Sequence, residues 1–396
     1  MSARLHVATV VTRFQAGAGS VALRGAMGLD PDRFRVSVIA GSGDRLLDEA
    51  NDAGFEVRLV PSLRPDVRPS DEWRALHDIA GMLEATRADV VHTHSAKAGA
   101  VGRLAARRAG VVRIVHTYHG FPFHEFQSPA RRAAYVRIER VLGRFTDVGL
   151  CVGTGVAVEA VRRRLIAPER IRTIGVAVDG NAPACTPAAR TAARVALGVP
   201  PGALVVGAVG RLTYQKAPED FVAALAALGR ADVVGVWIGD GELRDVMRRA
   251  VAAARVRIIL AGERNDVTAL LPALDVFALP SRYEGLPVAI VEAMVCGIPV
   301  IATAVNAVSD VVIPGCTGLL VPPERPDLLA GAIGCLLDDP ASAAEMAMAA
   351  RLRLSGQHSN EALGKALTSA YLPAIGPVAT SPGSRNEPES KEHACA

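Results

Sequence analysis

Two glutamates, Glu284 and Glu292, lie eight positions apart in the segment SRYEGLPVAIVEAMVC. Glu292 is flanked by valine, isoleucine, alanine, methionine and cysteine, a composition typical of a helix that is otherwise apolar and buried. A buried carboxylate without a partner costs several kcal/mol, so a charge at such a place requires a ligand or a strong ion pair. Because carboxylates accept hydrogen bonds from hydroxyl groups, this pair predicts a polyhydroxylated ligand.

The turn between the two glutamates is a candidate phosphate site. It follows the apolar run DVFALP, and Pro287 suits the first turn of a helix, where its missing N–H costs nothing. Gly285 and Leu286 would then expose backbone N–H groups at a helix N-terminus, which binds anions. Glu284 precedes the turn and Glu292 lies about a turn and a half into the helix. A sugar before the phosphate and a ribose beyond it would satisfy both carboxylates; the alternative is a helix cap and a pairing with an arginine.

A second charged pair, Arg211 and Lys216, occurs in VGRLTYQKAPEDFVAA. Arg211 ends an apolar run and Lys216 follows a short turn, so both cations can reach one cleft and hold the two charges of a diphosphate. Alone the pair is a weak signal, because most such cations are solvated. With them at a diphosphate no divalent ion is required, and the DPD at residues 30–32 indicates a polar turn rather than a metal motif.

The elements that must position these residues form two successive series of short apolar runs, separated by helix-length amphipathic segments. Such runs indicate parallel strands that are covered on both faces. Two series predict an α/β protein with two facing, doubly wound, Rossmann-like domains and a cleft at the carboxyl ends of their strands. The runs are 5–11, 34–41, 55–61, 89–95, 113–120, 147–153 and 171–178, then 204–212, 233–241, 256–262, 275–281, 299–305 and 318–323.

The domain boundary is expected in DGNAPACTPAAR, which has prolines, a glycine and no periodicity. We therefore expect an N-terminal domain at 1–180 and a C-terminal domain at 181–358. A helix at 359–375 closes the compact fold, and the polar tail at 376–396, rich in proline, serine and glutamate, is expected to be disordered.

The longest motif, PSRYEGLPVAIVEAMVCGIPVIAT, resembles the signature segment of the retaining glycosyltransferases of family four (glycosyl transferases group 1), which share the GT-B fold. VGRLTYQKAPEDFVAA resembles that family's other hallmark. The resemblance covers residues 4–373 and is densest from 204 to 325. It implies transfer of a hexose-type sugar from a nucleotide-diphosphate sugar to an acceptor hydroxyl, with retention and without a metal ion. The acceptor implied is a glycolipid, a lipid-linked saccharide or a cell-envelope precursor; the nucleotide sugar is a substrate, and no cofactor is expected.

The resemblance also implies a role for each matching residue. Glu284 would contact the donor sugar near its C3 hydroxyl, Glu292 the ribose, and Arg211 with Lys216 the diphosphate. The catalytic pair would be Glu284 and His119, whose imidazole in HTYHGF corresponds to the family's active-site histidine near the sugar's C6 hydroxyl. The turn beside the phosphates and the sugar would be formed by Gly285, Leu286 and Pro287.

Two further loops match the family less closely. In AGERNDV, Arg264 and Asp266 would border the nucleobase. Gly17 and Gly19 resemble the glycine loop that approaches the acceptor and the donor phosphate, although Ala18 separates glycines that are usually adjacent. This stretch is not GxGxxG, so a dinucleotide-dependent dehydrogenase is disfavoured.

The segment AVNAVSDVV is a second departure, because the family commonly shows Gly-Gly-x-x-Glu there. Asn306, Ala307 and Asp310 occupy those positions, which puts the local backbone geometry near the nucleotide in question.

Histidines at two strand ends, in HTHSAK and HTYHGF, raise the alternative of a zinc site. No carboxylate set accompanies them, so we expect no metal. His92 and His116 fit buried, hydrogen-bonded core histidines better, while His94 and Lys97 would face the acceptor.

Charge is unevenly distributed, with 26 Lys/Arg against 18 Asp/Glu in residues 1–177 and a net charge of +4 overall. Part of this excess lies in a helix at 128–145, whose apolar stripe is formed by Ala134, Ile138, Val141, Leu142 and Phe145. The helix could lie on an anionic membrane surface or pack its stripe on the core. No nucleic-acid-binding motif accompanies its arginines.

The chain contains six cysteines without CxxC spacing and no apolar run near the ~18 residues of a membrane span. These features predict a protein of the cytoplasm, or of the inner face of the membrane. Two other functions stay open: a GT-B-fold epimerase of nucleotide sugars, and a non-catalytic protein that binds them.

Overall fold

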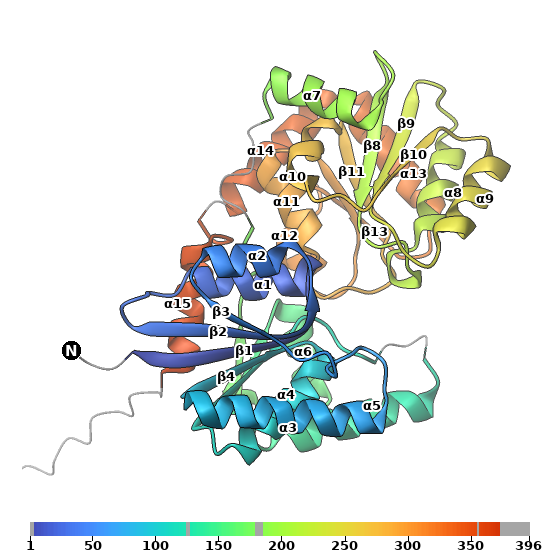
Figure 1. The fold of residues 1–396 in the computed structure, drawn as a ribbon. Coiled ribbons are helices and arrows are strands. Elements are labelled where there is room, and N and C mark those ends of the chain that lie inside the picture. The colour runs from blue at the N-terminus through green and yellow to red at the C-terminus, as the bar shows by residue number, and fades with distance from the viewer. Residues whose placement is uncertain (1–3, 124–126, 179–184, 355, 373–396) are drawn as a thin grey trace, which may run out of the picture.

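The computed structural model describes residues 4–123, 127–178, 185–354 and 356–372. They form two α/β domains, one above the other in Figure 1, each with a parallel sheet between helices. The predicted fold class, two facing doubly wound domains, is confirmed. The expected boundary at 180/181 and the tail at 376–396 lie outside the described residues.

The N-terminal domain contains a seven-stranded sheet in the order β3-β2-β1-β4-β5-β6-β7, with every pair parallel. Figure 1 shows α3, α4 and α5 on one face, and α1 and α2 on the other. The strands are β1 (Leu5–Phe14), β2 (Phe34–Gly43), β3 (Glu56–Leu59), β4 (Val90–His94), β5 (Arg113–Tyr118), β6 (Val148–Cys151) and β7 (Ile171–Thr173). The helices are α1 (Ala16–Met27), α2 (Arg45–Asp52), α3 (Pro69–Thr86), α4 (Ala96–Arg108), α5 (Pro129–Gly143) and α6 (Thr154–Arg162), with a 3-10 turn η1 (Pro168–Arg170).

The C-terminal domain contains a six-stranded parallel sheet in the order β10-β9-β8-β11-β12-β13. The strands are β8 (Leu204–Val209), β9 (Val233–Ile238), β10 (Ile258–Gly262), β11 (Val276–Leu279), β12 (Val300–Thr303) and β13 (Leu319–Val321). The helices are α7 (Pro187–Leu197), α8 (Pro218–Leu228), α9 (Arg244–Ala254), α10 (Val267–Leu270), α11 (Val288–Cys296), α12 (Val308–Val311), α13 (Pro326–Asp338) and α14 (Pro340–Leu354). Two 3-10 turns, η2 (Tyr214–Lys216) and η3 (Leu271–Ala273), complete this domain.

Both sheets have their switch point at the first strand of the series. β1 pairs with both β2 and β4, and β8 pairs with both β9 and β11, so the connections diverge on either side of these strands. In such sheets ligands bind at the carboxyl edge near the switch point. The strands are buried on both faces, as in β11, whose four residues are all buried, which explains their near-continuous apolar sequence.

The last described helix, α15 (Asn360–Tyr371), returns to the N-terminal domain, where it lies beside α1 in Figure 1. Its contact with α1 is close, since a Cβ added to Gly28 would lie 1.8 Å from the Asn360 carbonyl oxygen. The hydroxyl of Tyr371 lies 2.7 Å from Nδ1 of His92 on β4. The C-terminal helix thus buries part of the N-terminal core and reaches His92 at the centre of the sheet.

Helix α5 does not pack as its sequence pattern predicts. Leu142 is buried, but Ile138 is 50% exposed and Val141 48% exposed. The helix turns a different set of residues inward, including Glu139, whose Oε2 lies 2.8 Å from Nη2 of the fully buried Arg103. The inward position of Glu139 gives the buried Arg103 its partner, and burying one charge without the other would be costly.

Among the described residues no helix is long and apolar enough to cross a membrane.

Candidate functional site

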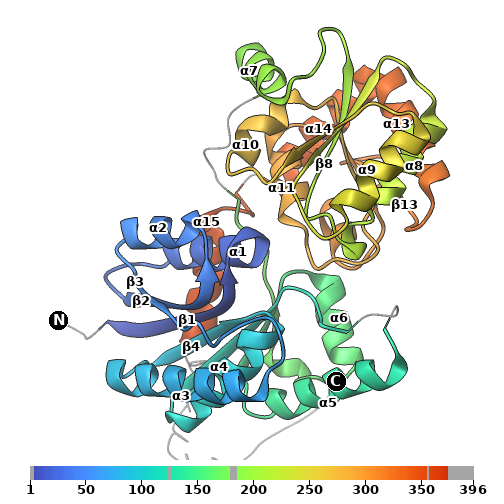
Figure 2. The same ribbon diagram turned by 45° about the vertical axis from the view of Figure 1, so that its right-hand side comes forward.

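The two domains meet where their carboxyl strand edges face each other (Figure 2). A Cβ added to Gly285, on the loop after β11, would lie 1.9 Å from the carbonyl oxygen of His119, on the loop after β5. A Cβ added to Gly17, in the first turn of α1, would lie 3.8 Å from Cγ2 of Val288 at the start of α11. The structure therefore brings together His119, Gly17 and the turn after β11.

Glu284 is the buried member of the predicted glutamate pair, with 6% of its surface exposed. Its Oε1 accepts a hydrogen bond from Nζ of Lys216 at 2.5 Å, and its Oε2 accepts one from Nε2 of Gln215 at 3.1 Å. Both partners come from η2, the turn after β8. The two motifs singled out in the sequence thus form one charged unit.

Arg282 holds these two loops together, and the sequence pattern did not single it out. Its backbone N–H donates to the Gln215 carbonyl at 2.8 Å, and its Nη1 donates to the Tyr214 carbonyl at 2.9 Å. The guanidinium also lies 4.4 Å from the Tyr214 ring centroid and 3.0 Å from Oε1 of Glu219. An arginine two positions before Glu284, in the loop that directly follows the apolar strand β11, was the available signal.

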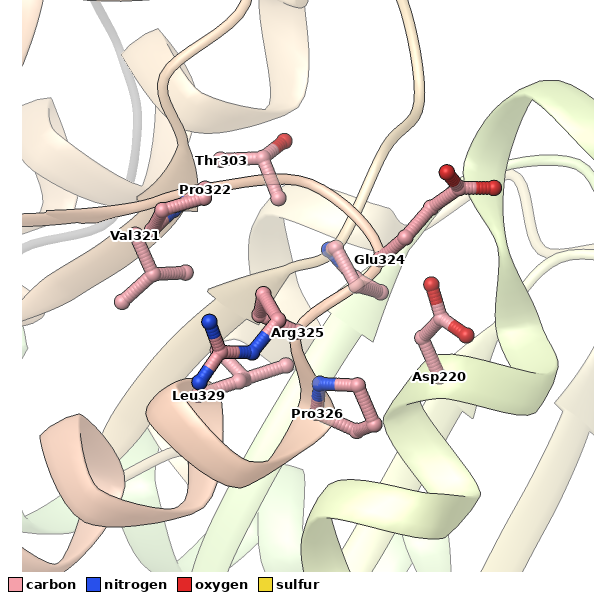
Figure 3. Close-up of a pocket in the computed structure, with 9 residues that line it drawn as sticks. Asp220, Thr303, Val321, Pro322, Glu324, Arg325, Pro326 and Leu329 are labelled. Carbon is pink, nitrogen blue, oxygen red and sulfur yellow. The ribbon is translucent and has the colours of Figure 1, made fainter.

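Behind this unit lies a small pocket formed by the ends of β12 and β13 and the starts of α8 and α13 (Figure 3). Asp220 and Glu324 line it, and both also lie within ion-pair distance of Arg282, at 3.8 and 3.1 Å. Burial raises the pKa of the Asp220 carboxyl, against the lowering effect of Arg282. The pocket is too narrow to hold a nucleotide, so it is not the donor site.

Helix α11 starts one residue later than predicted. Pro287 is its N-cap, with an extended ψ of 117°, and not a residue of the first turn. The backbone of Gly285 and Leu286 nevertheless precedes the helix N-terminus, as expected. Glu292, on α11, is only partly buried, so its apolar neighbours did not predict its own burial.

The other predicted residues lie around this centre. Arg211 is exposed at the end of β8. Arg264 and Asp266, after β10, pair with each other through Nη2 and Oδ2 at 2.6 Å. Gly19 contacts Phe14 closely and keeps α1 against the end of β1, since a Cβ there would lie 2.7 Å from the Phe14 carbonyl carbon.

The segment that departs from the family pattern forms a contact between the domains. Asn306 adopts a positive φ of 44°, a conformation that asparagine tolerates better than most residues, and its amide donates to the Glu284 carbonyl. Oδ2 of Asp310 accepts a hydrogen bond from the backbone N–H of Thr154, at the N-terminus of α6, at 2.5 Å. This segment thus supports the site and connects it to the opposite domain.

Three histidines of β4 and β5, His92, His94 and His116, are buried, and His119 on the loop after β5 is partly buried beside them. His92 Nε2 lies 2.7 Å from Thr117 Oγ1, and His116 Nδ1 lies 2.8 Å from Thr93 Oγ1, so both are hydrogen-bonded core histidines, as expected. Nδ1 of His94 lies 2.9 Å from Nε2 of His119. Within the described ranges, no group of three or more His, Cys, Asp or Glu side chains could hold a metal ion.

Burial lowers the pKa values of these histidines and so makes the stability of the fold depend on pH. Desolvation lowers the pKa of His92 from 6.5 to about 3 and that of His119 to about 4, and it lowers the pKa values of His94 and His116 well below 6.5. Between pH 6.5 and 4 the unfolded chain therefore binds protons that the folded chain does not. The contribution of these neutral histidines to the free energy of unfolding is fully present above pH 6.5. It decreases as the pH falls through this window.

We expect the free energy of unfolding to fall by up to about 1.4 kcal/mol per pH unit for each of these histidines below pH 6.5. Urea unfolding at pH 7, 6 and 5 measures this slope above the range in which carboxylates titrate. The slope should be smaller in His92→Gln. A stability that is flat across this window would contradict the neutral, buried state of the group.

Family models and known proteins match most of this chain. The family model described as Glycosyl transferases group 1 matches residues 203–339, and that described as Glycosyltransferase Family 4 matches residues 16–181. An Escherichia coli protein named UDP-Gal:alpha-D-GlcNAc-diphosphoundecaprenol alpha-1,3-galactosyltransferase is 31% identical over 320 residues, which cover 78% of this chain and 82% of that protein. A 2-deoxystreptamine N-acetyl-D-glucosaminyltransferase from Streptomyces fradiae is 31% identical over 358 residues, or 82% of each chain.

Solved structures share the architecture. HepE from Anabaena, crystallised with UDP and glucose, superposes with a TM-score of 0.82 at 20% identity over 92% of this chain and 99% of its own. WaaG, a glycosyltransferase involved in lipopolysaccharide biosynthesis, gives a TM-score of 0.71 at 18% identity over 92% of this chain and 99% of its own. At these identities the likeness shows the fold.

Proposed function

Because this chain belongs to the glycosyl transferases of group 1, Glycosyltransferase Family 4, we propose that it transfers a hexose from a UDP-sugar to a hydroxyl group of a lipid-linked saccharide, with retention at the anomeric carbon and without a metal ion. Membership of this GT-B family makes it a glycosyltransferase that uses a nucleotide-sugar donor. In the proposal the nucleotide sugar binds the C-terminal domain (181–358) and the acceptor the N-terminal domain (1–180).

The observation that carries the proposal is the ion pair between Lys216 and the buried Glu284, directly before Gly285, which packs against the His119 backbone. A carboxylate with 6% exposure that is held by an ammonium has a fixed position, and the ammonium keeps further N–H groups for a phosphate oxygen. Fixed charges in a cleft that closes against water stabilise a developing charge better than solvent does. A departing nucleoside diphosphate requires this kind of stabilisation.

The proposed reaction uses these groups for positioning and for charge. Arg211, Lys216 and the N–H groups of Gly285 and Leu286 hold the diphosphate, while Glu284 and His119 orient the hexose and the ribose lies against Glu292. Arg264 and Asp266 border the base, and the loop of Gly17 and Gly19 borders the acceptor. The bond from the anomeric carbon to the diphosphate oxygen breaks and leaves an oxocarbenium-like sugar. The acceptor oxygen bonds to the same face, and its proton goes to the departing phosphate oxygen.

The acceptor class is supported by the Escherichia coli relative, whose name gives a GlcNAc-diphosphoundecaprenol acceptor and a UDP-Gal donor. The Streptomyces fradiae relative is named for a small, soluble acceptor, 2-deoxystreptamine, at the same identity. We favour the lipid-linked class because the N-terminal domain also exposes an apolar and basic helix face, described below.

The decisive experiment is a transfer assay with EDTA present. UDP-galactose, UDP-glucose and UDP-N-acetylglucosamine are each offered with a short-chain GlcNAc-diphosphopolyprenol or with 2-deoxystreptamine. We expect a disaccharide product only with the lipid-linked acceptor, and an anomeric proton coupling that matches the donor's configuration. Transfer to 2-deoxystreptamine alone, inversion, or loss of transfer in EDTA would each overturn the corresponding part of the proposal. Conversion of the donor without any acceptor would indicate an epimerase, and binding without turnover a binding protein.

The exposed face of α5 is the proposed membrane contact. Ile138 and Val141 expose about half of their surfaces, and four exposed arginines lie on the same helix or at its C-cap. An apolar strip flanked by arginines suits the interface of an anionic bilayer, where each cation contributes about 1 kcal/mol. The four arginines are Arg131, Arg137, Arg140 and Arg144.

We expect the protein to co-sediment with vesicles that contain phosphatidylglycerol and not with phosphatidylcholine vesicles, and to be released by high salt. The double variant Ile138→Ser/Val141→Ser should weaken vesicle binding about tenfold, since it removes two apolar side chains from the contact. Val195→Ser is the matched control, because Val195 is equally apolar, 76% exposed and on α7 of the other domain. Equal binding of all variants would exclude α5 as the contact.

A further inference from the structure

His94 is the hydrogen-bond partner of the His119 ring within the described part of the chain. β4 and β5 are parallel neighbours with His94 opposite Thr117, which places His94 at the strand edge beside the loop that carries His119. Nδ1 of His94 lies 2.9 Å from Nε2 of His119, and the ring centroids are 5.2 Å apart with an interplanar angle of 30°. His94 itself is 2% exposed. From the sequence we expected it to face the acceptor, but a side chain buried to this degree does not.

The hydrogen bond between the two rings can be assigned a donor and an acceptor. Desolvation lowers both pKa values, so both imidazoles are neutral near pH 7, and each carries one proton on one of its two nitrogens. Of the two facing nitrogens, one must therefore donate and the other accept. If His119 donates through Nε2, the proton of His94 must lie on its own Nε2.

That second arrangement leaves a buried N–H without a partner. Nε2 of His94 is buried and has no hydrogen-bond partner among the described residues. Orphaned buried N–H groups are rarer in proteins than under-satisfied acceptors. The proton of His94 therefore belongs on Nδ1, where it is used in the bond to His119, and its Nε2 is a bare acceptor.

We propose that His94 is a positioning residue that donates from Nδ1 to Nε2 of His119 and so holds His119 in the tautomer protonated at Nδ1. His119 then offers an N–H donor, and not a lone pair, through its remaining nitrogen. It can stabilise an oxygen of the sugar or of the departing phosphate, but it does not take the acceptor's proton. This inference rests on the proposed function of His119 and extends it to a residue that never touches the substrate.

The ring of His94 is held in place by His92, which is in turn held by Thr117 and by Tyr371 of α15. The His94 ring lies against that of His92, with centroids 4.1 Å apart. Nδ1 of His92 lies 2.7 Å from the Tyr371 hydroxyl, and its Nε2 lies 2.7 Å from Oγ1 of Thr117, so His92 cannot rotate without losing both contacts. The C-terminal helix α15 thereby fixes the His94 ring from behind.

The test combines ring 15N chemical shifts with kinetics on the full-length protein. Histidine-labelled wild type, assigned by comparison with His119→Gln, should show His119 protonated at Nδ1 and His94 likewise. His94→Leu keeps most of the volume but removes the donor, and it should lower kcat/KM about 10–100-fold, as is typical for partners that orient an imidazole. His94→Asn retains an amide donor near the position of Nδ1 and should recover most of this loss.

His116→Leu is the matched control, because it removes another buried imidazole of β4 and β5 that bonds to Thr93 and not to His119. It should lower stability without changing the His119 tautomer. A wild-type His119 protonated at Nε2 would overturn the inference, as would wild-type kcat/KM in a folded His94→Leu. If His94→Leu does not fold, the wild-type ring shifts decide. They need no turnover, so absence of glycosyl transfer would refute the proposed function separately.

Discussion

Lys216→Ala is expected to lower kcat/KM for glycosyl transfer by about 10²–10³, the usual effect of removing one preorganised charge from a transition state. The substitution removes a cation from the proposed diphosphate site. It also leaves Glu284, at 6% exposure, with Gln215 as its remaining hydrogen-bond partner from η2. Steady-state kinetics and calorimetric titration with UDP measure the two consequences, and both transfer and UDP binding should weaken.

Three further variants locate the cause of this loss. Lys216→Arg keeps the charge but changes its shape, and should recover only part of the activity. Glu284→Gln should be non-additive with Lys216→Ala, because the two side chains are in direct contact at 2.5 Å. Lys365→Ala, in an exposed pair with Glu361, should match wild type. UDP binding that is unchanged in Lys216→Ala would show that the pair is structural and that the donor lies elsewhere.

Gly285→Ala is expected to reduce kcat/KM by about 10², since a displacement of about 1 Å at a catalytic centre has effects of this size. The added methyl group would lie 1.9 Å from the His119 carbonyl oxygen across the domain interface. Gly285 does not require a positive φ, so alanine can adopt its backbone conformation and keep its N–H. The expected defect is therefore in the approach of the domains and not in folding.

Binding and turnover should separate in this variant. The nucleotide contacts proposed above lie mainly in the C-terminal domain, so UDP affinity should change little while transfer falls. Gly331→Ala is the control, because a Cβ there, in helix α13, meets nothing within 4 Å. Wild-type kinetics in Gly285→Ala would mean that catalysis does not need the domains as close as they are here. A parallel loss of UDP affinity would place the defect in the turn itself.

Lys216 and Gly285 contribute to the site in different ways. Lys216 supplies a positive charge within the C-terminal domain. Gly285, which lacks a side chain, lets the two domains approach each other at His119. The structure has other contacts between the two domains, such as the bond between Asp310 and the backbone of Thr154. Closure of two domains over a donor excludes water and limits hydrolysis, so the contacts that permit closure matter as much as the charges inside.

The sequence alone determined the architecture, because strand and helix periodicity are local properties. Apolar runs bounded by turns predicted all the sheet strands from β1 to β13, and their two series predicted two facing domains. The spacing of Glu284 and Glu292 with Arg211 and Lys216 was enough to identify the family, which the family models confirm. A motif preserves residue types in order, and that order is readable without coordinates.

Only the tertiary structure decided how these residues meet. Lys216 and Glu284 are 68 positions apart, His94 and His119 are 25 apart, and His92 and Tyr371 are 279 apart. Each contact depends on the packing of several elements, which no local pattern encodes. The burial of Glu284 in place of Glu292, and the exposed stripe of α5 beside its buried Glu139, have the same origin. Which side of a helix faces inward is set by the partner that packs against it, and that partner lies far away in the chain.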